Sequence, residues 1–142
     1  MRRRFAAVLL ALACAAALAG CGREGGGGGE GVDAVVRDFR GLTEELASKV
    51  ETARDPKAGV AEAQRLLDAR KAEMAARINA LRRRAPAEDP AARGKWLEAE
   101  VDGAQRVHEL QLKYLDAAAR DPELKAALGR LAADYESMLK ER

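Results

Sequence analysis

The chain has 142 residues, of which 48% are hydrophobic, 34% are charged and only 4% are aromatic. This length suits one domain and leaves no room for a two-domain enzyme. A composition rich in alanine, leucine, glutamate and arginine, with few β-branched residues, argues against a β-sandwich or β-barrel and predicts an all-α fold. The formal charge of +2 comes from the three arginines at positions 2–4, and residues 21–142 carry one more acid than base. The charge therefore gives no reason to expect a nucleic-acid partner.

The first twenty residues have the pattern of a secretory signal peptide. Arg2, Arg3 and Arg4 form a positively charged segment, and residues 5–18 form an apolar run of alanine, leucine, valine, phenylalanine and one cysteine. Such a run is too short to cross a bilayer comfortably as a permanent anchor, but it fits the apolar region of a signal peptide. A short membrane anchor remains the alternative.

The leader ends in Leu18, Ala19, Gly20 and Cys21. This pattern resembles the lipobox of bacterial lipoproteins, and the resemblance covers residues 1–21. It implies cleavage between Gly20 and Cys21 and attachment of lipid to the Cys21 thiol, with two or three acyl chains giving stable membrane anchoring. Gly22 stands where many inner-membrane lipoproteins have aspartate, so the resemblance favours the periplasmic face of the outer membrane over the inner membrane. An ordinary signal peptide followed by a chance cysteine is the alternative.

Lipidation would leave the processed chain without a free thiol, because Cys14 is removed with the leader and Cys21 is the only other cysteine. A disulfide, a thiolate metal site and a cysteine nucleophile are then excluded.

Residues 21–31 are expected to form a flexible tether between Cys21 and a domain that spans residues 32–142. Seven of the ten residues 22–31 are glycine. A coil of this composition has a mean reach of roughly 15–20 Å. A phosphate-binding glycine loop would need a preceding strand and a following Lys-Ser or Lys-Thr pair, and the sequence has neither.

From residue 32 onward, apolar residues recur at helical spacing and never alternate with a period of two. Asp55, Asp89 and Asp121 each precede a proline, which is a favourable way to begin a helix. We therefore expect helices near 33–54, 56–84, 90–119 and 122–141. Short connections predict an antiparallel four-helix bundle with up-down-up-down topology. The junctions at Asp55 and Asp121 are so short that a kinked long helix at either point is the main alternative.

The third expected helix carries two apolar stripes. Leu97, Val101 and Leu115 lie on the stripe that we assign to the core, together with His108. The second stripe lies about 100° away and contains Trp96, Gly103, Val107, Leu110 and Tyr114. We predict a surface for a homodimer or another partner at Trp96, Leu110 and Tyr114, although contact with a second neighbouring helix would also explain this stripe.

No residue pattern indicates an enzyme, a metal site or a cofactor. His108 is the only histidine, and its expected height in the bundle does not match Met74 or Met138, which argues against a haem ligand pair. We expect a half-buried, hydrogen-bonded histidine with Tyr135 nearby. Zinc and di-iron sites lack sufficient ligands.

Arg82, Arg83 and Arg84 form the densest basic run of the domain. They are weak candidates for contact with anionic headgroups, because cations commonly stabilise the C-terminal end of a helix. Taken together, the sequence predicts a lipid-anchored envelope protein with a non-enzymatic structural or protein-interaction role. The alternative is a helical bundle that binds a hydrophobic or haem-like molecule in its core.

Overall fold

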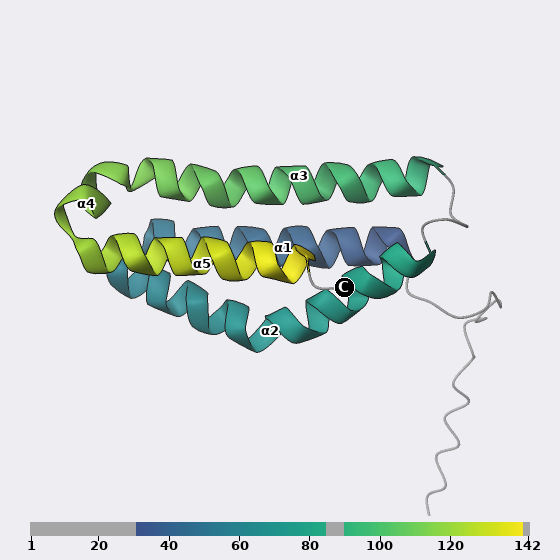
Figure 1. Cartoon of the computed structure of the whole chain (residues 1–142), viewed down its shortest axis with the longest axis horizontal. Helices are drawn as coiled ribbons and strands as arrows, with labels where there is room; N and C mark the ends of the chain where they lie inside the picture. Colours follow the sequence, from purple (N-terminus) through teal and green to yellow (C-terminus); the bar gives the residue numbers. More distant parts are fainter. Residues whose placement is uncertain (1–30, 85–89, 141–142) are drawn as a thin grey trace, which may run out of the picture.

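A computed structural model describes residues 31–84 and 90–140, and every element in these ranges is helical. The elements are α1 (Val32–Thr52), α2 (Pro56–Arg84), α3 (Pro90–Lys113), α4 (Leu115–Arg120) and α5 (Pro122–Lys140). The prediction of an all-α fold is confirmed. Figure 1 shows four long helices side by side, with the short α4 at the turn between α3 and α5.

Of the three aspartates that were predicted to cap a helix, two lie in the described residues, and both form the expected caps. Asp55 accepts hydrogen bonds from the backbone N–H groups of Lys57 and Ala58, at 3.1 and 3.3 Å. Asp121 accepts them from Glu123 and Leu124, at 2.9 and 3.2 Å. The extended backbone of Ala53 and Asp121 separates the helices, so neither junction is a kinked continuous helix. The third expected cap, Asp89, lies outside the described residues.

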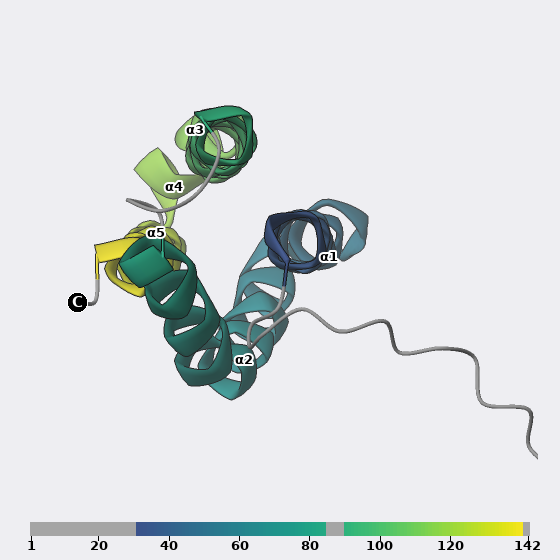
Figure 2. The same ribbon diagram turned by 90° about the vertical axis from the view of Figure 1, so that its right-hand side faces the viewer.

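The long helices alternate in direction along the chain, as predicted, but spatial neighbours do not follow chain order. α1 packs against both α2 and α3, whereas α5 packs mainly against α2 and more sparsely against α3. Viewed along the bundle, α3 therefore lies on the side opposite α2 (Figure 2). Helices of the same direction are adjacent in two pairs, α1 with α3 and α2 with α5. Short connections predicted the alternation of direction but not this arrangement.

Ion pairs between α1 and α3 show their parallel register. Three of them join residues separated by the same interval of 62 positions. They are Asp33 with Lys95, Arg40 with Asp102 and Glu51 with Lys113. A constant interval arises only when two helices run in the same direction with equal rise per residue. These ion pairs therefore show that α3 lies parallel to α1 and in which register.

The third predicted helix, 90–119, is wrong in one respect: it is interrupted at Tyr114. This residue has φ −102° and ψ 13°, and α4 begins after it. The Tyr114 hydroxyl donates a hydrogen bond to the carbonyl oxygen of Val50 on α1, at 3.2 Å. α4 contacts α5 and buries Ala118. The break thus allows the chain to leave α3 and pack toward α5 before the turn at Asp121.

Candidate functional site

The two apolar faces of α3 are reversed relative to the sequence prediction. Trp96 and Leu110 are buried, with exposed fractions of 8% and 1%, and Tyr114 is half-buried. The predicted partner surface at Trp96, Leu110 and Tyr114 is therefore wrong for this fold, because these side chains pack inside the bundle. The stripe assigned to the core instead faces outward. Its large members, Leu97, Val101 and Leu115, are all more than half exposed.

Close packing around Gly103 explains which face of α3 is buried. A Cβ atom at this position would lie 2.8 Å from a ring carbon of Phe39 and still closer to the Tyr135 hydroxyl. Phe39 also contacts the Trp96 ring, with centroids 5.2 Å apart in a T-shaped arrangement, and the Tyr135 ring, with centroids 5.9 Å apart. Phe39 of α1 and Tyr135 of α5 therefore occupy the space beside Gly103, and Trp96 of α3 packs against Phe39.

A buried pair of hydroxyl groups lies beside this aromatic cluster. The Thr43 hydroxyl donates to the Phe39 carbonyl oxygen at 3.0 Å, and it lies 2.7 Å from the Tyr135 hydroxyl. Because threonine has a single hydroxyl proton, Tyr135 must be the donor to Thr43. Burial raises the pKa of Tyr135 well above its ordinary value. This hydroxyl pair satisfies its own polar groups and has the character of a structural contact rather than of a catalytic site.

His108 lies on the exposed face of α3, which corrects the expectation of a half-buried histidine near Tyr135. Met74 and Met138 are both buried. In the described part of the chain, no group of three or more histidine, cysteine, aspartate or glutamate residues could hold a metal ion.

The three arginines at the end of α2 lie in three different environments. Arg82 binds the Glu100 carboxylate at 2.8 Å and also donates to the carbonyl oxygen of Leu139. Arg84 donates to the Ala80 carbonyl oxygen within its own helix, and Arg83 is exposed. Arg82 thus joins the ends of α2, α3 and α5, so it is not available as a free headgroup contact.

Charged groups also hold α3 against α1. Arg106 donates two hydrogen bonds to the Glu51 carboxylate, the shorter at 2.7 Å, and Lys113 donates a third at 3.0 Å. These hydrogen bonds lower the pKa of Glu51, and those from Arg106 have the largest effect. The same contact raises the pKa of Arg106. The cluster ties Arg106 and Lys113 of α3 to Glu51 of α1, in agreement with the burial of the Trp96 face.

The outward face of α3, together with the first residue of α4, forms what we call the outer stripe. It comprises four exposed apolar residues, Leu97, Val101, Leu112 and Leu115. Ala104 and His108 are exposed between them. Within α3, positions 97, 101, 104, 108 and 111 alternate in steps of four and three, which is the spacing of a coiled-coil seam. Within the described structure, no helix covers this seam.

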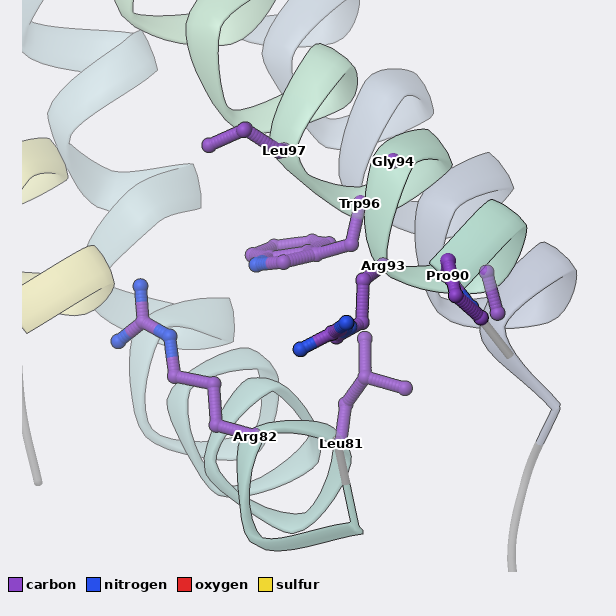
Figure 3. Close-up of a pocket in the computed structure, with 8 residues that line it drawn as sticks. Leu81, Arg82, Pro90, Arg93, Gly94, Trp96 and Leu97 are labelled. Atoms are coloured by element: carbon purple, nitrogen blue, oxygen red, sulfur yellow. The ribbon is translucent and has the colours of Figure 1, made fainter. Parts of the chain in front are cut away.

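A cleft lies where α3 begins and α2 ends, and we call it the Trp96 cleft. Its volume is about 420 Å³. The lining residues are Leu81, Arg82, Pro90, Ala92, Arg93, Gly94, Trp96 and Leu97. Figure 3 shows Trp96 and Arg93 projecting from α3 toward Leu81 and Arg82 of α2. The indole N–H of Trp96 is buried and has no hydrogen-bond acceptor.

The remaining predicted site residues, Gly20 and Cys21, lie outside the described residues. None of the helices that the structure describes combines the length and the apolar character needed to cross a membrane. In comparisons with protein-family models, curated proteins and solved structures, nothing matches the chain.

The sequence contained one indication, although not a decisive one, of which face of α3 is buried. A glycine inside a helix costs about 1 kcal/mol relative to alanine, so it often marks a close approach between elements. Gly103 lies on the stripe of Trp96 and not on that of Leu97. The Trp96 cleft had no comparable signal, because Leu81 and Trp96 approach each other only through the packing of α2, α3 and α5.

Proposed function

We propose that this chain is an outer-membrane lipoprotein, anchored on the periplasmic side, whose helical bundle has a non-enzymatic protein-interaction role. The membrane is engaged through acyl chains on Cys21, and the domain acts through a surface on α3. The anchoring part of the proposal rests on the lipobox resemblance and on the glycine-rich tether that follows it.

The observation that supports the interaction role is the outer stripe. Leu97, Val101 and Leu112 share one face of α3, and Leu115 begins α4; all four have exposed fractions between 56% and 61%. Single exposed apolar residues need no explanation, but several on one face commonly mark a contact with another protein. Their coiled-coil spacing fits a helical partner, either a second copy of this chain or another envelope protein.

Acidic side chains next to the stripe favour a protein over an anionic lipid surface as its partner. Glu98 and Glu100 flank Leu97 and Val101 along α3. A helix that lies on anionic lipid has lysine and arginine in such flanking positions. The acyl chains would therefore serve as the membrane contact, while the stripe remains available for a protein.

Lipidation is tested by metabolic labelling with an alkyne analogue of palmitate. The wild-type chain should be labelled, and a Cys21→Ser variant should lose the label and accumulate as unprocessed precursor. Cys14→Ser is the matched control, because it removes the leader cysteine and should leave labelling unchanged. Equal labelling of the wild type and the Cys21→Ser variant would contradict the lipoprotein assignment.

The interaction surface is tested by placing a photoreactive amino acid at Val101 in the full chain, in intact cells. The expected result is a discrete crosslinked band, which mass spectrometry identifies as a second copy or as another envelope protein. Arg70, an exposed residue of α2, is the control position and should give no such band. Absence of a band at Val101, or the same bands from both positions, would contradict an interaction role for the outer stripe.

A further inference from the structure

A second hollow lies next to the Trp96 cleft, and the two share Leu97 in their walls. The adjoining groove has a volume of about 400 Å³ and lies between α3 and the C-terminal end of α5. Leu97 lines both hollows, and Val101, Ala104 and Leu139 extend the apolar wall away from Trp96. From Arg93 to Ala104 the α3 side is roughly 17 Å long at 1.5 Å per residue. Both hollows are mostly apolar, with Arg82 and Arg93 at the Trp96 cleft and Glu100, Glu136 and Lys140 at the adjoining groove.

An unsatisfied polar group points into the Trp96 end. The indole N–H of Trp96 has no acceptor, although the residue is buried, with only 8% of it exposed. Buried donors are nearly always paired in native structures, so an unpaired one is a specific observation that calls for an acceptor. Figure 3 shows the nitrogen edge of the indole facing the space between α3 and Arg82.

The charges along the two hollows leave one positive charge uncompensated. Arg82 binds Glu100 at 2.8 Å, and Lys140 binds Glu136 at 2.9 Å. Arg93 also lines the Trp96 cleft, and it has no carboxylate partner among the described residues. One cation and one N–H donor at the end of an apolar groove are complementary to a single anionic acceptor with a long aliphatic tail.

We propose that the Trp96 cleft and the adjoining groove bind a free long-chain carboxylate. The carboxylate accepts hydrogen bonds from the Trp96 indole and from the Arg93 guanidinium, and the aliphatic chain lies along Leu97, Val101 and Leu139. This ligand-binding role does not depend on the anchoring or interaction roles, but the bound acid would cover Leu97 and Val101 of the outer stripe and so compete there with a protein partner. It differs from a ligand in the bundle core, because the core itself is filled by Phe39, Tyr135 and their neighbours.

The first test uses palmitate that carries a photoreactive diazirine near the end of its chain, added to envelope membranes that contain the full chain. Mass spectrometry should locate the adducts on α3 and α5 around Val101 and Leu139. Unlabelled palmitate should compete with the probe for the groove. Its uncharged methyl ester should compete about tenfold less well, because it lacks the charge that strengthens the hydrogen bonds from Trp96 and Arg93. Adducts distributed over all exposed faces, or equal competition by the ester, would overturn the proposal.

Two variants provide a matched comparison. Leu97→Glu places a charge in the wall of the groove and should lower labelling about tenfold or more, by analogy with the cost of burying an unpaired charge. Leu112→Glu makes the same change on the same helix, at nearly the same exposure of 57% against 60%, but outside both hollows, and labelling should be unchanged. Equal labelling of these two variants would overturn the proposal, provided that their melting temperatures agree.

A separate measurement requires no substitution near the groove. Trp96 is the only tryptophan of the chain, so its fluorescence reports directly on the cleft. A dibrominated stearate should quench this fluorescence by contact, and unbrominated stearate should reverse the quenching. Unquenched fluorescence would overturn the proposal.

The acyl chains on Cys21 are the other source of aliphatic groups, and a Cys21→Ala variant distinguishes them from free acid. Palmitate labelling should be the same with and without Cys21. A several-fold increase in the variant would show that the protein's own acyl chain fills the groove, which would overturn binding of the free acid. Loss of metabolic lipidation in this variant concerns the proposed anchoring only, so the two proposals can fail independently.

Discussion

The two faces of α3 have similar apolar content, but one is buried in the fold and the other is exposed. The inner face, with Trp96, Gly103, Val107 and Leu110, is buried against α1 and α5. The outer face carries two leucines and one valine that are more than half exposed. The difference shows that hydrophobicity alone does not select the core face of a helix. Shape decides it here, because Phe39 of α1 and Tyr135 of α5 fill the space beside a position where α3 has only a glycine.

The strongest test of this comparison replaces one residue from each face with alanine. Trp96→Ala should destabilise the protein by about 3–5 kcal/mol, because it leaves a large cavity beside Phe39. Leu97→Ala should change the free energy of unfolding by less than about 0.5 kcal/mol, as expected for an exposed residue. Urea denaturation of both full-chain variants measures the difference. Similar losses from the two substitutions would show that the outer face is also packed.

Two glycines of α3 offer a second comparison, in which the expected difference in stability is nearly as large. Gly103→Ala should cost about 1–3 kcal/mol, because the new methyl group would overlap the Phe39 ring and the Tyr135 hydroxyl. Gly94→Ala should be neutral or stabilise the protein by up to about 1 kcal/mol, since no atom lies within 4 Å of its Cβ position. Thermal melting measures both effects. A stabilising Gly103→Ala substitution would mean that α3 is not held close to α1 and α5.

A smaller effect is expected at the hydroxyl pair behind Gly103. Tyr135→Phe removes the hydrogen bond to Thr43 and should cost about 0.5–1.5 kcal/mol. The raised pKa of Tyr135 also predicts a pH dependence. Above about pH 10, the ordinary tyrosine pKa, the folded state retains a proton that the unfolded state releases, so stability should fall as the pH rises. Tyr135→Phe should weaken this alkaline loss, whereas Tyr114→Phe, which changes a half-buried tyrosine, should leave most of it in place.

The smallest predicted effect concerns the charges that orient α3. Glu51→Gln weakens the contacts with Arg106 and Lys113 and should cost about 0.2–1 kcal/mol at neutral pH, because the pair is partly exposed. The lowered pKa of Glu51 means that its contribution is present above about pH 4.5 and is lost as the pH falls through the folded pKa. The difference in melting temperature between wild type and Glu51→Gln should therefore shrink below pH 4.5. A constant difference between pH 3 and pH 7 would contradict this assignment.

Local features of the sequence predicted much of the fold. Asp55 and Asp121 begin helices through hydrogen bonds to backbone N–H groups only two or three residues away, so the sequence contains both partners. In α1, α2 and α5 the buried apolar residues recur at the helical spacing from which the sequence predicted helices. These are interactions of short range, and neighbouring residues suffice to specify them.

The sequence did not determine which helices become neighbours or which stripe of α3 is buried. Directions alternate along the chain, yet α1 lies beside α3 because the Phe39, Trp96 and Tyr135 rings and the charges of Glu51 and Arg106 fit in that arrangement. Each of these contacts joins residues more than fifty positions apart. A helix with two apolar stripes has two acceptable orientations in isolation, and only the volumes of the surrounding side chains distinguish them. For the same physical reason, the exposed outer stripe and the Trp96 cleft became visible only in the tertiary structure.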